Sequence, residues 1–227
     1  MADFPGGCLV ASTRGLRVRH RHLLRDVVKL LPHAKTAAKI DAHKARNSQQ
    51  PDDDPFKRLL HACEERDCDS SILFDARDPA RLYMWIVNCP DGPSAMFRVL
   101  NTHTVAELNL DARRVVGVRN LLVFDTNFSA STERRLMRAL LIRAFSVPKV
   151  KAHSAAHDDT ESPARHTLSF TWLQNAIFVR AYRNDSTRDD TDGLSDPMRL
   201  TEIGPRLVLR PVRIIASGFS GTILHGS

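Results

Sequence analysis

The first half of the chain opens with an apolar run, a basic loop and an amphipathic stretch. Residues 8–11 are apolar and predict a buried strand. Over residues 19–31 leucine and valine recur with the spacing of one helix face, and Pro32 follows as a helix terminator. Residues 35–55 are polar and predict a long loop. The pattern beyond them predicts a short helix over 56–63, followed by three strands over 72–74, 83–87 and 96–100.

The second half repeats this order of elements. Residues 121–124 predict a buried strand, and residues 132–145 predict a long helix that ends before Pro148. After a polar stretch at 149–165, Leu168, Phe170 and Trp172 alternate with polar neighbours, as in a half-buried strand. The remaining pattern predicts a turn at Gln174 and Asn175 and a return strand over 177–181. It then predicts an acidic loop over 183–197 and a further strand-like stretch over 200–215.

The repeated order predicts an α/β fold built from two similar halves. Neither half has enough helices to cover a sheet alone, so we expect the two to pack together as one domain. No Gly/Ser-rich or Pro-rich linker separates them. We place the domain at residues 8–221, with an N-terminal half at about 8–100, a C-terminal half at about 101–221, and short termini at 1–7 and 222–227.

The distribution of charge changes this picture more than the composition does. The chain of 227 residues has a net charge of +7, and residues 1–50 hold ten Lys or Arg against three Asp. This segment therefore carries the whole excess, which favours a polyanionic partner at one end of the molecule. The alternative is a solvated basic face. No apolar stretch is long enough to span a membrane, no secretory signal is visible, and four cysteines are typical of reduced thiols in an intracellular protein.

The basic excess is concentrated between the first strand and the first helix. Basic side chains at a helix N-terminus are unfavourable unless an anion lies there, and the arginine fork binds phosphate in a bidentate manner. The alternative is a basic loop neutralised by the acidic loops of the same chain. We predict RNA-binding residues in this region: Arg14, Arg17, Arg19, His20, Arg21, His22, Arg25 and Lys35.

Catalytic and metal-binding patterns are weak in this sequence. Phosphate-binding glycine loops and nucleophile elbows are absent, and the paired aspartates lie in polar stretches. His61, Cys63 and Cys68 lack the spacing of a zinc site. We therefore predict no catalytic residue, no metal and no cofactor. The aromatic pairs Tyr83/Trp85 and Phe170/Trp172 are interpreted as core, with base-stacking platforms as the alternative.

Several separated motifs resemble the Brix family of ribosome-assembly proteins, in the family's order over nearly the whole chain. The segments that carry the resemblance are Ser12-Thr13-Arg14-Gly15, Arg19-His20-Arg21-His22-Leu23, Leu82-Tyr83-Met84-Trp85, Gly92-Pro93-Ser94-Ala95-Met96-Phe97 and Glu202-Ile203-Gly204-Pro205-Arg206. Met96 departs from the pattern, because the family usually has Lys there.

The resemblance implies a function as well as a fold. Within the family, the Arg-His-Arg-His run and the Leu-Tyr-Met-Trp segment are most similar to the member that works on the precursor of the large ribosomal subunit. The resemblance implies two halves similar to the anticodon-binding domain of some tRNA synthetases. It further implies a nucleolar, non-catalytic protein that binds precursor large-subunit rRNA. It also implies protein partners: an EBNA1-binding-protein-like assembly factor and other pre-ribosomal large-subunit proteins. The alternative is a protein-interaction scaffold of the same particle without major RNA contact.

Overall fold

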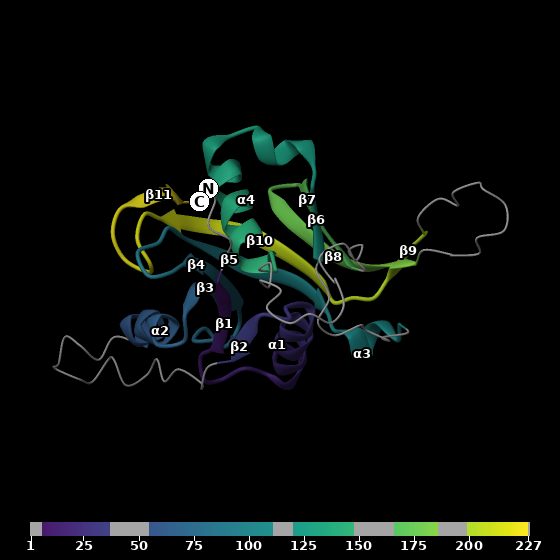
Figure 1. Cartoon of the computed structure of the whole chain (residues 1–227), viewed down its shortest axis with the longest axis horizontal. Coiled ribbons are helices and arrows are strands. Elements are labelled where there is room, and N and C mark those ends of the chain that lie inside the picture. Colours follow the sequence, from purple (N-terminus) through teal and green to yellow (C-terminus); the bar gives the residue numbers. More distant parts are fainter. Residues whose placement is uncertain (1–5, 37–54, 111–119, 148–165, 186–198, 227) are drawn as a thin grey trace, which may run out of the picture.

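A computed structural model describes residues 6–36, 55–110, 120–147, 166–185 and 199–226 (Figure 1). No helix in these ranges is long and apolar enough to cross a membrane. The helices are α1 (Val18–Leu30), α2 (Pro55–Glu64), α3 (Val105–Leu108), the 3₁₀ helix η2 (Thr126–Ser129) and α4 (Thr132–Phe145). The strands are β1 (Gly7–Ser12), β2 (Ala34–Thr36), β3 (Cys68–Asp75), β4 (Leu82–Asn88), β5 (Ser94–His103), β6 (Asn120–Phe124), β7 (His166–Leu173), β8 (Ala176–Asp185), β9 (Arg199–Glu202), β10 (Arg206–Ile215) and β11 (Ile223–Gly226).

The described strands form one continuous sheet in the order β2-β1-β3-β4-β5-β10-β8-β7-β6, with β11 beside β10 and β9 beside β8. In the N-terminal half β1 is parallel to β3, and β3, β4 and β5 are successively antiparallel. The C-terminal half has the same arrangement: β6 is parallel to β7, and β7, β8 and β10 are successively antiparallel. The antiparallel pair β5–β10 joins the halves. The predicted α/β fold of two similar halves in one unit is confirmed.

The strand register shows how closely the halves correspond. Val99 of β5 lies opposite Leu209 of β10 at the centre of the sheet. Leu82, the first residue of β4, pairs with Val99. Ile177, the second residue of β8, pairs with Leu209. The two halves are therefore related by a pseudo-two-fold axis close to the Val99–Leu209 pair.

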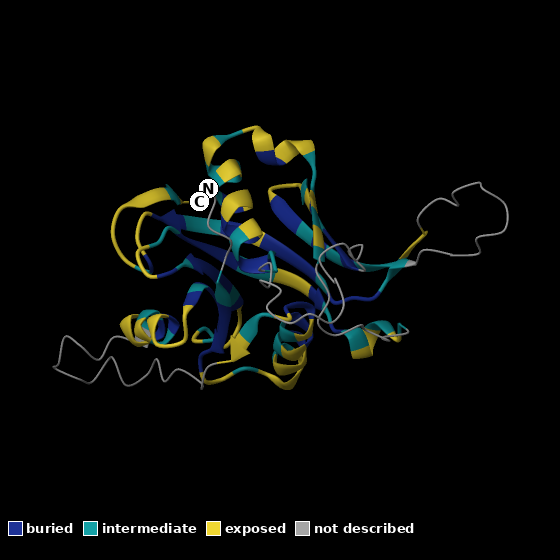
Figure 2. Ribbon diagram, viewed as in Figure 1, coloured by how far each residue is buried: buried dark blue, intermediate teal, exposed yellow. Residues whose placement is uncertain are grey.

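Two hydrophobic clusters lie on opposite faces of the sheet. The larger contains the inward faces of α1 and α4 together with strand residues from both halves, among them Val10, Phe97 and Leu209. The smaller lies under α2 on the N-terminal half, where Leu59 and Cys63 pack against Leu73 and Trp85. Alternation of side chains along each strand produces this division. Figure 2 shows the buried strands between helices whose outer turns are exposed.

The long helices also tie the halves to each other. Helix α4 belongs to the C-terminal half but contacts β3, β4 and β5 of the N-terminal half. Arg143 near its end lies 3.2 Å from the carboxylate of Asp69, which belongs to β3. In return, the Asn120 side chain at the start of β6 donates to the Leu30 carbonyl at the end of α1, at 2.7 Å. Each half therefore completes the other's packing.

Several short elements differ from the sequence prediction. Residues 35 and 36 were predicted as the start of a loop, but Ala34–Thr36 forms β2, because its backbone pairs in parallel with β1. The predicted strand over 200–215 is interrupted between β9 and β10, where Gly204 takes a φ of +60°. Helix α3, the 3₁₀ helix η2 and strand β11 were not predicted. Residues 183–185 were predicted as the start of an acidic loop but belong to β8, because their backbone pairs with β9. Most of the predicted loops at 35–55, 149–165 and 183–197 lies outside the described residues.

Candidate nucleic-acid interface

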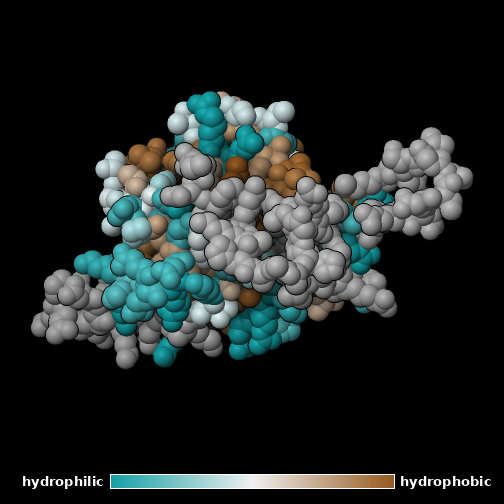
Figure 3. All heavy atoms as spheres, viewed as in Figure 1, coloured by the Kyte–Doolittle hydropathy of each residue, from teal (hydrophilic) through white to brown (hydrophobic). Residues whose placement is uncertain are grey.

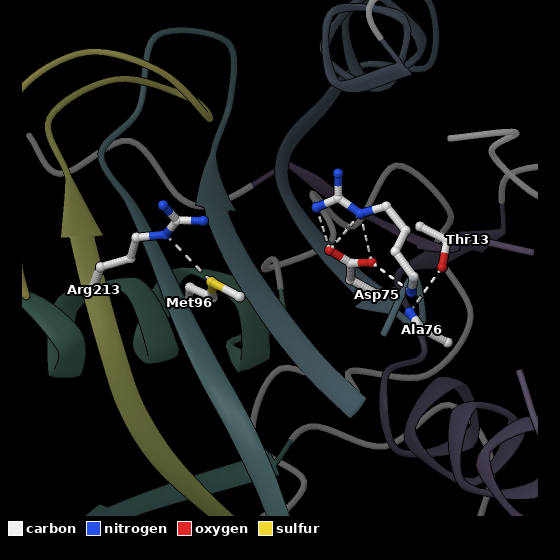
Figure 4. Close-up of polar contacts among 6 residues, drawn as sticks. Thr13, Asp75, Ala76, Met96 and Arg213 are labelled. Atoms are coloured by element: carbon white, nitrogen blue, oxygen red, sulfur yellow. Dashed lines mark hydrogen bonds and ion pairs between the residues drawn. The ribbon is translucent and has the colours of Figure 1, made fainter. Parts of the chain in front are cut away.

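The loop that carries the arginines is anchored at its start (Figure 4). The Thr13 hydroxyl accepts a hydrogen bond from the Ala76 amide at 2.8 Å, and the Thr13 amide donates to the Phe74 carbonyl at 3.0 Å. The buried carboxylate of Asp75 binds the Arg77 guanidinium, with Nε at 2.9 Å. The ends of β1 and β3 are thereby held together, so the following loop projects from a fixed point.

Helix α1 begins without the acid that a helix N-terminus favours. Its N-cap residue is Arg17, no side chain caps the first turn, and no acidic residue lies in that turn. The helix N-terminus carries a partial positive charge and free amide groups. Arg14, Arg17 and Arg19 are all exposed around it. This arrangement is electrostatically unfavourable for the protein alone and is relieved by an anion.

The outer face of α1 continues the basic surface. Arg21, His22, Arg25 and Lys29 are exposed on successive turns, away from the buried Leu23 and Val27. In the described part of the chain, no group pairs with the guanidinium of Arg21 or Arg25. The surface over α1 is hydrophilic in Figure 3. The predicted cluster therefore extends along the whole helix, and Lys29, four residues after Arg25, belongs to it.

A cleft of about 220 Å³ lies beside the first turn of α1. Arg17, Arg19 and His20 line one side. The other side contains Arg81, just before β4, and Arg98 on β5, together with the end of β5. These two arginines were not predicted as part of the site, because they lie more than sixty positions further along the chain and only the sheet brings them beside α1.

Arg19 is held within the protein. Its Nε lies 2.7 Å from the Glu107 carboxylate, and its guanidinium also donates to the Thr102 carbonyl. Glu107 forms a capping box with Thr104 at the start of α3. The hydrogen bond from the Thr104 amide, helped by Arg19, holds the pKa of Glu107 below its usual range. Arg19 therefore forms a wall of the cleft. The exposed Arg17 donates a hydrogen bond to the Pro79 carbonyl at 2.7 Å, and in the described part of the chain it has no ion pair like that of Arg19.

Asp26 and His20 give α1 its remaining polar contacts. Asp26 is buried and accepts a hydrogen bond from the Val105 amide at 2.8 Å, which fixes α3 against α1. Partial burial lowers the pKa of His20, and the neighbouring charges of Arg17 and Arg19 lower it further. His20 is therefore a neutral imidazole near pH 7 in the cleft without ligand.

Lys35 lies apart from the other predicted residues. It is on β2, opposite Leu9, and its ammonium donates to the Arg66 carbonyl. Helix α1 separates it from Arg17 by about 20 Å along the helix axis. The structure thus brings the predicted residues of 14–25 into one surface and leaves Lys35 outside it.

The aromatic pairs divide between core and surface. Trp85 and Phe170 are buried, which confirms the core interpretation for them, whereas Tyr83 and Trp172 are only half-buried. Met96, which replaces the family's usual lysine, is buried beside Arg213, whose Nε lies 3.3 Å from the Met96 sulfur (Figure 4). In the described ranges, no three His, Cys, Asp or Glu side chains are placed to hold a metal.

Comparison with known protein families matches residues 13–213 to the Brix domain. The chain belongs to the Brix family. It is 34% identical over 217 residues to the human "Ribosome biogenesis protein BRX1 homolog", covering 96% of this chain and 54% of that protein. It is 32% identical over 221 residues to "Ribosome biogenesis protein BRX1 homolog 1" of Arabidopsis thaliana, covering 96% and 65%. The chain thus spans about half the length of the human relative.

A solved structure supports the fold. It is described as the crystal structure of a probable ribosomal biogenesis protein from Aeropyrum pernix K1, with a TM-score of 0.54 and 14% sequence identity. The match covers 97% of this chain and 99% of the other. At this identity the likeness concerns the fold alone.

Several Brix motif residues have structural roles. A Cβ on Gly92, which has a φ of +95°, would lie 2.3 Å from the Ser217 backbone. A Cβ on Gly204 would lie 2.9 Å from the Leu108 side chain. Glu202 binds Arg206 through two hydrogen bonds of 2.7 Å across the break between β9 and β10. These motifs shape turns, in contrast to the exposed arginines of α1.

Proposed function

We propose that this Brix-domain chain is a non-enzymatic ribosome biogenesis factor of the BRX1 type that binds precursor rRNA of the large subunit in the nucleolus. The names of the relatives support the process. The observation that carries RNA binding is the uncapped start of α1, where arginines surround free backbone amides. The arginine-lined cleft beside it adds Arg81 and Arg98 to the same surface.

Phosphate explains this arrangement better than a solvated face does. The four arginines that line one small cleft repel each other, and the helix N-terminus adds to the same positive potential. Two described carboxylates reach this surface, and both are already paired: Glu107 lies 2.7 Å from Arg19, and Asp78 lies 3.8 Å from Arg81. An RNA backbone supplies closely spaced negative charges that the arginine forks can bind.

The first prediction tests this surface through its salt dependence. Each phosphate contact releases counterions, and for single strands the log–log slope of affinity against salt is about −0.7 per contact. Replacing Arg14, Arg17 and Arg21 with Gln should weaken binding to many RNA sequences alike and flatten the slope by roughly 2 units. Filter binding or fluorescence anisotropy over a salt series measures both quantities.

A matched control is available on α2, on the opposite face of the sheet. Lys57 and Arg58 on α2, and Arg66 two residues after its end, are exposed, and their replacement by Gln removes the same charge. This variant should keep nearly the original slope. If the α1 variant remains folded and binds with unchanged affinity and slope, α1 is not the RNA site, and the scaffold alternative is favoured.

A second surface supports a protein partner. Leu121 and Val123 on the edge strand β6 are 48% and 43% exposed, and Leu173 at the end of β7 is 53% exposed. In Figure 3 hydrophobic side chains gather over this part of the sheet. Exposed apolar residues on an edge strand are typical of interaction sites. We propose that the EBNA1-binding-protein-like factor, or another pre-ribosomal large-subunit protein, docks here.

The second prediction separates this partner surface from the RNA surface. A tagged chain should co-sediment with nucleolar precursor particles and be absent from translating ribosomes. Replacing Leu121 and Val123 with Ser should reduce co-sedimentation without changing affinity for isolated RNA, because the substitutions leave the arginines intact. The control is Ile223→Ser with Leu224→Ser, because these two residues of β11 are somewhat more exposed than Leu121 and Val123. Equal loss from both variants would show that β6 is not a specific docking surface.

A further inference from the structure

A second cleft, of about 460 Å³, lies at the start of α4. It opens between the first turns of α4, the β7–β8 turn, β10 and β11. Its lining residues are Ser131, Glu133, Arg134, Met137, Trp172, Gln174, Asn175, Arg210, Pro211 and His225.

The two clefts occupy equivalent positions in the two halves. The first lies between the start of α1, the beginning of β4, and the part of β5 from Arg98 to Thr102. The second lies between the start of α4, the β7–β8 turn, and the part of β10 just past Leu209. Val99 and Leu209 are partners at the pseudo-two-fold axis, which relates β4 to β8 and β5 to β10. Each cleft is therefore formed by the corresponding helix and strands of its own half.

The chemistry of the second cleft is different. Arg134 lies over the Trp172 ring at 4.4 Å from its centroid, so a flat guanidinium covers a half-exposed indole. Met137 and Pro211 add apolar surface. The exposed Arg210 makes no ion pair or hydrogen bond within the described part of the chain. Glu133 is the carboxylate of this lining, against two arginines.

We propose that this second cleft binds one unpaired base of the RNA strand, stacked on the Arg134–Trp172 pair, with Arg210 on a neighbouring phosphate. The inference rests on the proposed RNA-binding function and assigns a separate site to it. Aromatic rings and arginine planes are the surfaces on which proteins stack unpaired bases. The exposed amides of Gln174 and Asn175, at the tip of the β7–β8 turn, supply donors and acceptors for a base edge.

The spacing of the clefts allows one strand to reach both. Asn101 of the first cleft is paired with Val208, whereas Pro211 of the second is paired with Phe97. These two positions are four residues apart along β5, which is about 13 Å. Arg98 of the first cleft and Arg210 of the second are direct strand partners, so the two linings adjoin at that pair. A few nucleotides of extended single strand cover this distance. In this arrangement the arginine-rich first cleft takes phosphates and the more apolar second cleft takes a base.

The test compares two oligoribonucleotides, of about eight uridines, one with its bases and one with abasic sugars in their place. Both carry the same phosphates. The unaltered chain should bind the oligonucleotide that has bases about tenfold more tightly, because stacking favours it. Tryptophan emission should fall only with that oligonucleotide. Trp85 is 2% exposed, so the change reports on Trp172.

Arg134→Lys keeps the charge but removes the planar guanidinium, so it should abolish most of the preference for bases while leaving the salt slope unchanged. Arg210→Gln should flatten the slope by about 0.7. Arg199→Gln, at an exposed arginine on β9, is the charge-matched control and should change neither quantity. Thermal melting of each variant checks that the fold is retained.

Three results would overturn the proposal. Equal binding of both oligonucleotides, with the α1-dependent salt slope intact, removes the base site and leaves the proposed function standing. If the unaltered chain does not bind RNA at all, both the base site and the proposed RNA-binding function are ruled out. If Arg134→Lys keeps the preference for bases but loses a partner protein, the cleft is a protein site.

Discussion

At the scale of single residues, the opening motif separates into two kinds of side chain. Thr13 and Asp26 are buried and hydrogen-bonded to backbone amides of other elements. Arg21 and Arg25 are exposed, and within the described residues nothing pairs with them. The first kind fixes where the loop and helix lie. The second kind has no such role, which is why we assign it to a ligand.

The third prediction concerns His20. Burial and the adjacent arginines lower its pKa below 6.5. A bound phosphate favours the imidazolium, so RNA binding should raise this pKa and take up a proton. RNA affinity should therefore increase as pH falls below 6.5, and His20→Gln should reduce that increase. Binding at constant ionic strength from about pH 5.5 to about pH 8 measures it.

The lowered pKa of His20 also determines how the stability of the fold without RNA depends on pH. Below pH 6.5 the unfolded chain takes up a proton at His20 that the folded chain does not. This residue's contribution to the free energy of unfolding therefore decreases as the pH is lowered. His61→Gln is the control, because His61 is exposed on α2. If His20→Gln and the unaltered chain show the same pH profile of RNA affinity, His20 is not beside the bound phosphate.

At the scale of elements, α4 is the clearest case of a helix shared by both halves. Leu141 is fully buried in the cluster that joins them, while its neighbour Ile142 is 38% exposed. As the fourth prediction, Leu141→Ala should lower the free energy of unfolding by about 2–5 kcal/mol, because it leaves a cavity in a packed core. Ile142→Ala should cost about 1 kcal/mol or less. Urea unfolding compares them, and equal losses would contradict this packing.

Helix α4 also shows what element-level prediction achieved. The pattern over 132–145 predicted the observed bounds, because Ser131 caps one end and the apolar stripe stops at Phe145. Strand β2 was missed for a different reason: three residues carry no periodicity, and their extended form depends on pairing with β1. Short edge elements are decided by their neighbours.

At the scale of the whole molecule, neither half has a complete core. Helix α4 packs on β3, β4 and β5, and the β5–β10 pair joins the sheets. As the fifth prediction, residues 1–110 or 111–227 expressed alone should be poorly folded, because each fragment exposes the surface that the other half covers. Co-expression should restore a folded complex. Circular dichroism and urea titration test this, and a cooperative transition like the intact chain's in either fragment alone would show independent domains.

The sequence by itself determined the long elements, the repeat of two halves and the basic segment at 14–25, because helical periodicity, strand alternation and local charge are properties of neighbouring residues. Tertiary structure alone decided which cations share a surface. It placed Arg81 and Arg98 beside Arg17, engaged Arg19 with Glu107, and left Lys35 at the far end of α1. It also set Arg134 on Trp172. Such groupings depend on strand order and on the crossing of helices between halves, which join positions that are far apart in the chain.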